Sequence, residues 1–231
     1  MRIWKDAGLL AGLIVFVPFM TSGQVNGWWG GLKVEKKIIS GLTAEVEGQA
    51  RFYDGSGLKS WLADGGLEYK VNKYVSAGVF YRHIRRRKFD NDLGTYSYST
   101  RHRFYGNINV RYKVTDWLRV EYRFRYQNQF KDDQAGIVAT GSYFRHRLEL
   151  AYKTKSPFSP YLSADVFYQI KAGFDQVRYK AGCDYDINKR NSVGIACFAD
   201  YTIPGMSRQG QVVAVQYGLK LKSAKTKKQR A

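Results

Sequence analysis

The amino-acid sequence predicts an all-β fold, a transmembrane antiparallel up-and-down β-barrel of about 10–12 strands. Three observations lead to this fold class. The chain starts with a segment typical of export, long stretches beyond it alternate between apolar and polar residues, and aromatic residues gather near the ends of the apolar sets. A period of two indicates β-strands, because successive side chains of a strand point to opposite faces.

The first 23 residues have the order of a secretory signal peptide. Arg2 and Lys5 precede an apolar stretch at 7–20, and small residues follow up to Gly23, where we expect cleavage. The apolar stretch is shorter than the roughly 20 residues that a helix needs to cross a bilayer. We therefore divide the chain into a signal peptide (1–23), an outer-membrane barrel (24–221) and a basic C-terminal tail (222–231).

The clearest alternation covers residues 98–114. Its even positions, such as Ile108, are almost wholly apolar, whereas its odd positions are polar or charged and include Arg103 and Arg111. After a short turn the pattern resumes in the same phase over 118–127. The two segments therefore predict a hairpin with one matched apolar face.

The same signature recurs along most of the remaining chain. Its segments are 42–52, 61–71, 75–81, 144–152, 162–170, 177–187, 193–203 and 213–221. Together with the hairpin this makes about ten strands, each near the 9–11 residues that a tilted membrane strand requires. The segment 28–38 would make the count odd, whereas single-chain bacterial barrels have even counts. We leave open whether it is a partial strand, an inner plug or one of an unresolved pair.

The aromatic residues decide which face of the strands meets lipid. A soluble β-sandwich would alternate too, but it would bury the apolar sets. Tyrosines and tryptophans near both ends of these sets instead resemble the girdles that sit at lipid headgroups. One rim would carry Trp61, Tyr98, Tyr126, Tyr168 and Tyr201, and the other Tyr69, Tyr112, Trp117, Tyr152 and Tyr185. The apolar sets are therefore expected to face outward.

Connection lengths predict the orientation of the barrel. Short links at 72–73, 115–116 and 188–191 alternate with longer ones at 84–97, 131–141 and 204–210. Outer-membrane barrels keep short turns on the periplasmic side and long loops outside. Only the link at 153–160 is long for its periplasmic side.

Several segments resemble a known family of outer-membrane barrels from environmental and gut Gram-negative bacteria, which carries only a domain-of-unknown-function label. The resemblance lies in GLEYKVNKYVSAGVFYRH from Gly66, RHRFYGNINVRYKV from Arg101, LRVEYRFRYQ from Leu118, FRHRLELAYK from Phe144 and VRYKAGCDYDINK from Val177. It implies a barrel in the outer membrane but supplies no activity and no site residues. The basic tail departs from the aromatic last residue that is usual in such barrels.

Three histidines near the extracellular strand ends are candidates for catalysis: His83, His102 and His146. A hairpin centred near Asp92 would place His83 opposite His102, with Ser99 close by, and general-base chemistry needs only hydrogen-bond reach. The sequence favours the simpler interpretation, in which these histidines contact lipid phosphates at the interface. A hydrolase acting on lipid or peptide at the outer rim is the alternative.

The polar sets predict a charged lumen. Its cations are Arg51, Arg82, Arg101, Arg103, Arg111, Arg119, Arg123, Arg125, Arg145, Arg147, Arg178 and Lys180, and its main acids are Glu121, Glu149, Asp165 and Asp184. Since buried charges need partners, we expect each of these acids to pair with an arginine across a closed, filled lumen. The sequence thus favours a structural or surface-binding barrel of unknown specific activity, without general porin activity. Because arginine outnumbers the acids, an anion-binding or narrow anion-selective lumen is the alternative.

The formal charge of +19 would suggest nucleic acid in a cytosolic protein. In an exported barrel this charge favours binding to an anionic membrane surface. We therefore expect outer-membrane lipid, lipopolysaccharide and the barrel-assembly machinery as partners, and no nucleic acid. No His, Cys and carboxylate cluster has ligand spacing, so we expect no metal or cofactor. Cys183 and Cys197 are predicted to face each other across a hairpin centred near Arg190.

Overall fold

The computed structural model describes residues 25–53, 57–90, 94–133, 136–153, 156–203, 205 and 207–222. The predicted signal peptide and all of the predicted tail except Lys222 lie outside the described residues. Within the described part, no helical segment has the length and hydropathy of a membrane span.

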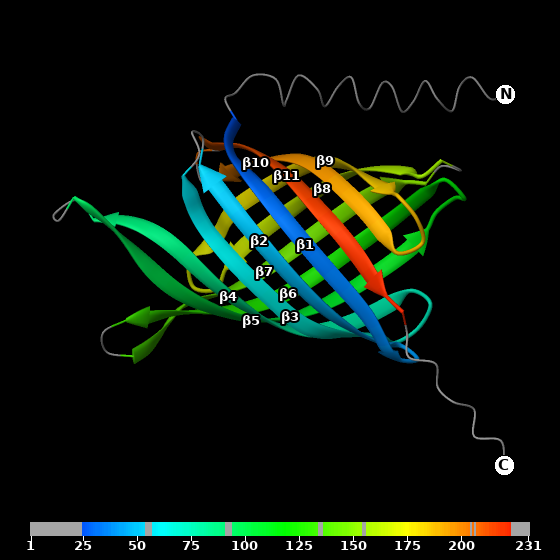
Figure 1. The fold of residues 1–231 in the computed structure, drawn as a ribbon, viewed down its shortest axis with the longest axis horizontal. Coiled ribbons are helices and arrows are strands. Elements are labelled where there is room, and N and C mark those ends of the chain that lie inside the picture. Colours follow the sequence, from blue (N-terminus) through cyan, green and yellow to red (C-terminus); the bar gives the residue numbers. More distant parts are fainter. Residues whose placement is uncertain are drawn as a thin grey trace, which may run out of the picture.

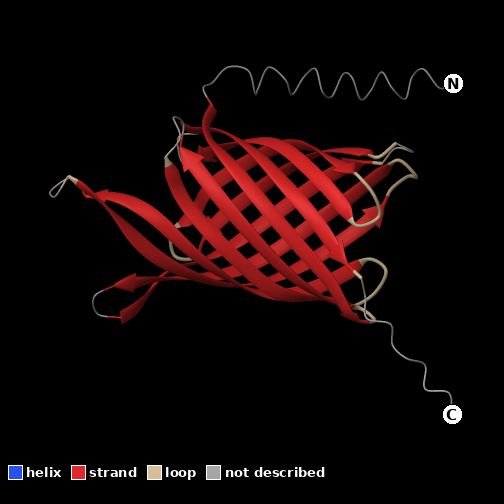
Figure 2. Cartoon of the chain, viewed as in Figure 1, coloured by secondary structure: helices blue, strands red, loops and turns tan. Residues whose placement is uncertain are grey.

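The described chain forms one closed barrel of eleven strands, so the predicted fold class is confirmed (Figures 1 and 2). Neighbouring strands of the sequence pair antiparallel, as in an up-and-down barrel. The strands are β1 (Val25–Ile39), β2 (Leu42–Tyr53), β3 (Leu58–Lys70), β4 (Val75–Asp90), β5 (Thr95–Lys113), β6 (Leu118–Asp133), β7 (Gly136–Tyr152), β8 (Phe158–Gln169), β9 (Gly173–Asp186), β10 (Asn191–Thr202) and β11 (Ser207–Leu221).

The segment that the sequence left open is a complete strand, β1. It pairs antiparallel with β2 and parallel with β11, with Trp28 opposite Val213 and Leu32 opposite Tyr217. In an up-and-down barrel an odd number of strands makes the first and the last run in the same direction, so closure requires a parallel pair. The expectation of an even count is wrong for this reason. Figure 1 shows β1 and β11 side by side.

Exposure along the strands is inverted relative to a soluble protein. Val79 and Ile195 on the outer face are 67% and 55% exposed, whereas Asn109 and Asp165 on the inner face are 1% and 0% exposed. A barrel wall that is apolar outside and polar inside is the arrangement of membrane β-barrels.

Most described residues of two predicted long loops lie in strands instead. Residues 84–90 and 95–97 belong to β4 and β5, and residues 131–133 and 136–141 belong to β6 and β7. These strand ends extend beyond the rest of the barrel (Figure 1). In β4 the run of cations from Arg85 to Lys88 obscured the alternation that would have predicted a strand. We call this end of the barrel the hairpin end and the opposite one the short-turn end.

The hairpin of β9 and β10 forms as predicted, but its register differs by two residues. Cys183 lies opposite Ile195, and Cys197 lies opposite Ala181. The turn is centred one residue earlier than expected, because the Asn188 side chain accepts hydrogen bonds from the backbone amides of Arg190 and Asn191. Neither cysteine is part of a disulfide, and the two lie on adjacent strands.

Substitution of an outward-facing residue by arginine tests whether the outer face of the barrel meets lipid. We predict that Ile108→Arg lowers the free energy of unfolding in lipid by about 2–4 kcal/mol, because it places a guanidinium in hydrocarbon. Val114→Arg, at the short-turn rim, is the matched control and should cost only about 0–1 kcal/mol. Urea unfolding followed by tryptophan fluorescence measures both, and equal costs would contradict the assignment.

Candidate functional site

Ion pairs line the inner wall of the barrel between adjacent strands. The partners Arg111 and Glu121 lie directly opposite each other on β5 and β6, with Nε 2.6 Å from Oε2. Arg178 and Asp200 make the same kind of pair between β9 and β10, at 2.6 Å. These cross-strand contacts run along the wall, because directly opposed side chains are closer than side chains across the lumen.

Of the four acids that were expected to pair, two do. Glu121 contacts Arg111 and Arg123, and Asp165 contacts Arg145 and Arg147. Among the described residues, no cationic nitrogen lies within 4.0 Å of the carboxylates of Glu149 or Asp184. The expectation that every one of these acids has an arginine partner across the lumen is therefore wrong for this part of the chain.

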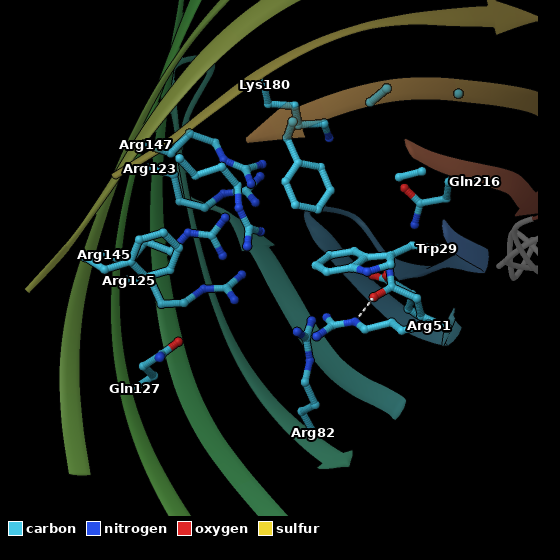
Figure 3. A pocket seen from close by; sticks show the side chains of 18 of the residues that line it. Trp29, Arg51, Arg82, Arg123, Arg125, Gln127, Arg145, Arg147, Lys180 and Gln216 are labelled. Atoms are coloured by element: carbon cyan, nitrogen blue, oxygen red, sulfur yellow. Dashed lines mark hydrogen bonds between the residues drawn. The ribbon is translucent and has the colours of Figure 1, made fainter. Parts of the chain in front are cut away.

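Four arginines of β6 and β7 form a patch on the inner wall that we call the arginine cluster. Arg123 lies opposite Arg147, and Arg125 lies opposite Arg145. Figure 3 shows their side chains extending from these two strands into the interior. Like charges directly opposite each other destabilise a sheet. The cluster therefore concentrates positive charge at a cost in stability.

The partners of the cluster do not balance its charge. Asp165 Oδ1 accepts hydrogen bonds from Arg145 Nε at 2.9 Å and from Arg147 Nε at 2.8 Å, so one carboxylate serves two cations. Arg125 Nε donates to the neutral amide of Asn107 at 2.8 Å, and its guanidinium lies 3.9 Å from the Tyr105 ring centroid. Two carboxylates, those of Asp165 and Glu121, thus face four guanidinium groups.

Further cations face the same space with neutral partners. Arg51 lies 3.8 Å above the Trp29 ring and donates from Nε to Gln49 at 2.7 Å. Arg103 donates from one terminal nitrogen to Gln129 at 2.9 Å, and its Nε is buried without a partner.

Two cavities occupy the interior, with volumes of about 520 and 460 Å³. The first, drawn in Figure 3, has ten Lys or Arg side chains and three Asp or Glu side chains among the described residues that line it. The second extends to Asn72 and Lys73 at the short-turn end. Their shared lining residues are Lys33, Glu47, Arg82, Arg123 and Arg125. The inward side chains therefore do not fill the lumen as the sequence led us to expect.

The histidine candidates lie on the outer face. His83 is opposite His102, as predicted, and their rings are 5.5 Å apart. His102 Nδ1 lies 2.6 Å from the Tyr81 hydroxyl, and its Nε2 lies 3.0 Å from Asp132 Oδ1. The odd-numbered Ser99 points to the inner face of β5, so the wall separates its hydroxyl from the His102 imidazole. The structure therefore does not bring Ser99 and His102 together.

His146 is on a different pair of strands. Its Nδ1 lies 2.7 Å from the Tyr122 hydroxyl of β6. The described residues contain no group of three His, Cys, Asp or Glu side chains arranged to hold a metal ion.

The sequence missed the inward aromatic residues of the first cavity. Trp29 and Phe198 pack edge to face with centroids 4.7 Å apart, and the Arg178 guanidinium lies 4.3 Å from the Phe198 centroid. Trp29 stands next to the outward Trp28 in β1, the segment whose strand character was left open.

Comparisons with known proteins place this barrel in a family. The family model described as "Protein of unknown function (DUF2490)" matches residues 26–202. A search of curated proteins found no match.

Two solved structures are similar to the chain in fold. The β domain of the Bordetella autotransporter BrkA has 13% identity and a TM-score of 0.48, with 78% of this chain and 82% of that chain covered. The translocator domain of autotransporter NalP from Neisseria meningitidis has 10% identity and a TM-score of 0.36, with 90% and 81% covered. We draw no functional conclusion from either likeness.

Removal of the Asp165 carboxylate, which Arg145 and Arg147 share, tests whether the arginine cluster depends on its few anionic partners. We predict that Asp165→Asn destabilises the barrel by about 3–5 kcal/mol, because two guanidinium groups whose side chains are only 13% and 17% exposed lose their anionic partner. Asp200→Asn is the matched control and should cost less, since Asp200 pairs with one arginine and its side chain is 22% exposed. Unfolding free energies measure both, and a neutral Asp165→Asn would show that the cluster does not need this carboxylate.

Proposed function

The chain belongs to the DUF2490 family of proteins of unknown function. We propose that it is an outer-membrane β-barrel whose cationic lumen binds small anions and lets them pass selectively. The observation that carries this proposal is the lining of the first cavity, which has ten cationic side chains and three carboxylates. Carboxylates behind the lining pair with six of these cations. The other four, Arg51, Arg103, Arg125 and Lys180, have no carboxylate within 4.0 Å among the described residues.

The outer surface supports residence in a membrane. Its exposed apolar side chains continue around the barrel, and aromatic pairs flank them at the short-turn end. These pairs are Tyr74 with Tyr112, Trp117 with Tyr152 and Phe158 with Tyr185. Such rings favour the level of lipid headgroups. The export signal expected at the N-terminus favours the outer membrane over the inner one.

The electrostatics of the arginine cluster support an anionic ligand. Guanidinium groups removed from bulk water repel one another and leave N–H donors short of partners, which costs free energy. An anion in the cavity would offset both costs, since arginine binds carboxylate and phosphate with paired hydrogen bonds. A purely structural barrel would gain stability from a carboxylate or an apolar residue at these positions.

The dimensions of the interior support small solutes. Each cavity lies within the roughly 300–1,000 Å³ that is usual for small-molecule sites. The five lining residues that the cavities share, four of them cationic, would form the narrow point between the two ends. A cationic constriction concentrates anions and excludes cations.

Planar-bilayer recording of the purified protein tests the proposal. Under a KCl gradient we expect small conductance steps whose reversal potential has the sign of chloride selectivity. The double variant Arg125→Gln/Arg147→Gln should reduce the anion-over-cation permeability ratio severalfold, because it removes half of the arginine cluster.

The double variant Lys171→Gln/Arg190→Gln is the control, since it removes the same charge from exposed turns. It should leave the permeability ratio unchanged. Cation selectivity, or a large and weakly selective conductance, would contradict the proposal.

A further inference from the structure

The outer face of β4 changes from apolar to cationic toward the hairpin end. Val79 and Tyr81 are exposed on the outer wall, His83 follows, and Arg85 and Arg87 continue the same face. This order matches the passage from hydrocarbon to headgroups. The two arginines are thus placed where a membrane lipid carries its phosphate.

Aromatic rings of β5 hold the two guanidinium groups on this outer face. The Arg85 guanidinium lies 5.0 Å from the Tyr98 ring centroid, and that of Arg87 lies 3.4 Å from the Tyr96 centroid. Among the residues whose side chains are described, no carboxylate oxygen lies within 4.0 Å of either arginine. A ring contact leaves the N–H groups at the guanidinium edge available to an anion.

An apolar pocket lies next to these arginines on the same face. It has a volume of about 500 Å³ and is lined by Tyr81, His102, Phe104, Phe130 and Ile137. His102 connects the pocket to the cationic positions, because it lies opposite His83, two residues from Arg85. Asp132, the acid beside the pocket, is held by His102 Nε2 at 3.0 Å.

We propose that this outer face is a binding site for a phosphorylated membrane lipid. Arg85 and Arg87 bind the phosphate, and the pocket on β5, β6 and β7 receives part of an acyl chain. In an outer membrane the lipid A portion of lipopolysaccharide has this chemistry. The wall separates the site from the lumen, so the site rests on the proposed outer-membrane location but not on the proposed passage of anions.

A lipid fits this site better than free phosphate, because the arginines and the pocket lie on the same outer face and are linked through the opposed His83 and His102. Free phosphate would use the guanidinium groups and leave the apolar pocket without a function. A lipid buries apolar area in the pocket while its phosphate neutralises the arginines. Binding should therefore depend on both parts of the surface.

Native mass spectrometry of the detergent-solubilised full chain tests the site. Titration with diphosphoryl lipid A should give a saturable complex, and phosphatidylcholine should bind more weakly. The double variant Arg85→Gln/Arg87→Gln should weaken lipid A binding roughly tenfold to thirtyfold, at about 1 kcal/mol for each cation near an anionic headgroup. The single variant Phe130→Ser should weaken it as well, because it makes the pocket polar.

The double variant Lys36→Gln/Lys37→Gln is the matched control, since it removes two exposed cations at the short-turn end. It should bind lipid A like the parent chain. Heat-modifiable mobility on gels verifies that every variant is folded. Equal losses in both double variants, unchanged binding by Arg85→Gln/Arg87→Gln, or competition by inorganic phosphate as strong as by lipid A would overturn the proposal.

Discussion

The parallel pairing of β1 with β11 is the contact on which the rest of the structure depends. Backbone N–H and C=O groups have no water to bond with inside a bilayer, so a membrane sheet must close on itself. Eleven up-and-down strands can close only with the first and last strands parallel, and the register from Val25 to Lys36 provides the bonds. Closure also brings Trp29 and Lys33 of β1 into the lumen, where both line the first cavity.

Closure creates an enclosed space, and the alternating sequence pattern places charged side chains on its inner wall. Because every second residue must face inward, the arginines of β6 and β7 are forced into directly opposite positions. Carboxylates of neighbouring strands compensate part of this charge through contacts along the wall. The remaining positive charge is the physical basis of the anion-binding lumen that we propose, whereas the lipid site that we propose on the outer face uses a separate set of residues.

Much of this architecture could be predicted from the sequence, because local rules determine it. Strict alternation over 98–127 predicted the face of each residue, and a hairpin centred near Asp92 was the prediction that placed His83 opposite His102, as the strand register has it. Other features depend on partners far along the chain. Nothing within residues 28–38 reveals that this segment pairs with β11. The hydrogen bonds of the Asn188 side chain move the β9–β10 turn by one residue from its predicted centre, which changes the register of the hairpin by two residues. The prediction that Glu149 and Asp184 pair with arginines was wrong, because ion pairing depends on how far each side chain reaches along the wall.

Cysteine cross-linking of β1 to β11 tests the closed barrel most directly. In a chain with Cys183→Ala and Cys197→Ala, the pairs Trp28→Cys with Val213→Cys and Val34→Cys with Leu219→Cys join directly opposed positions. Neighbouring strands lie about 4.8 Å apart, within the Cα range of a disulfide. Both pairs should cross-link within one chain, and the exchanged pairs, 28 with 219 and 34 with 213, should not. Cross-linking of the exchanged pairs alone would show antiparallel closure and contradict the eleven-strand barrel.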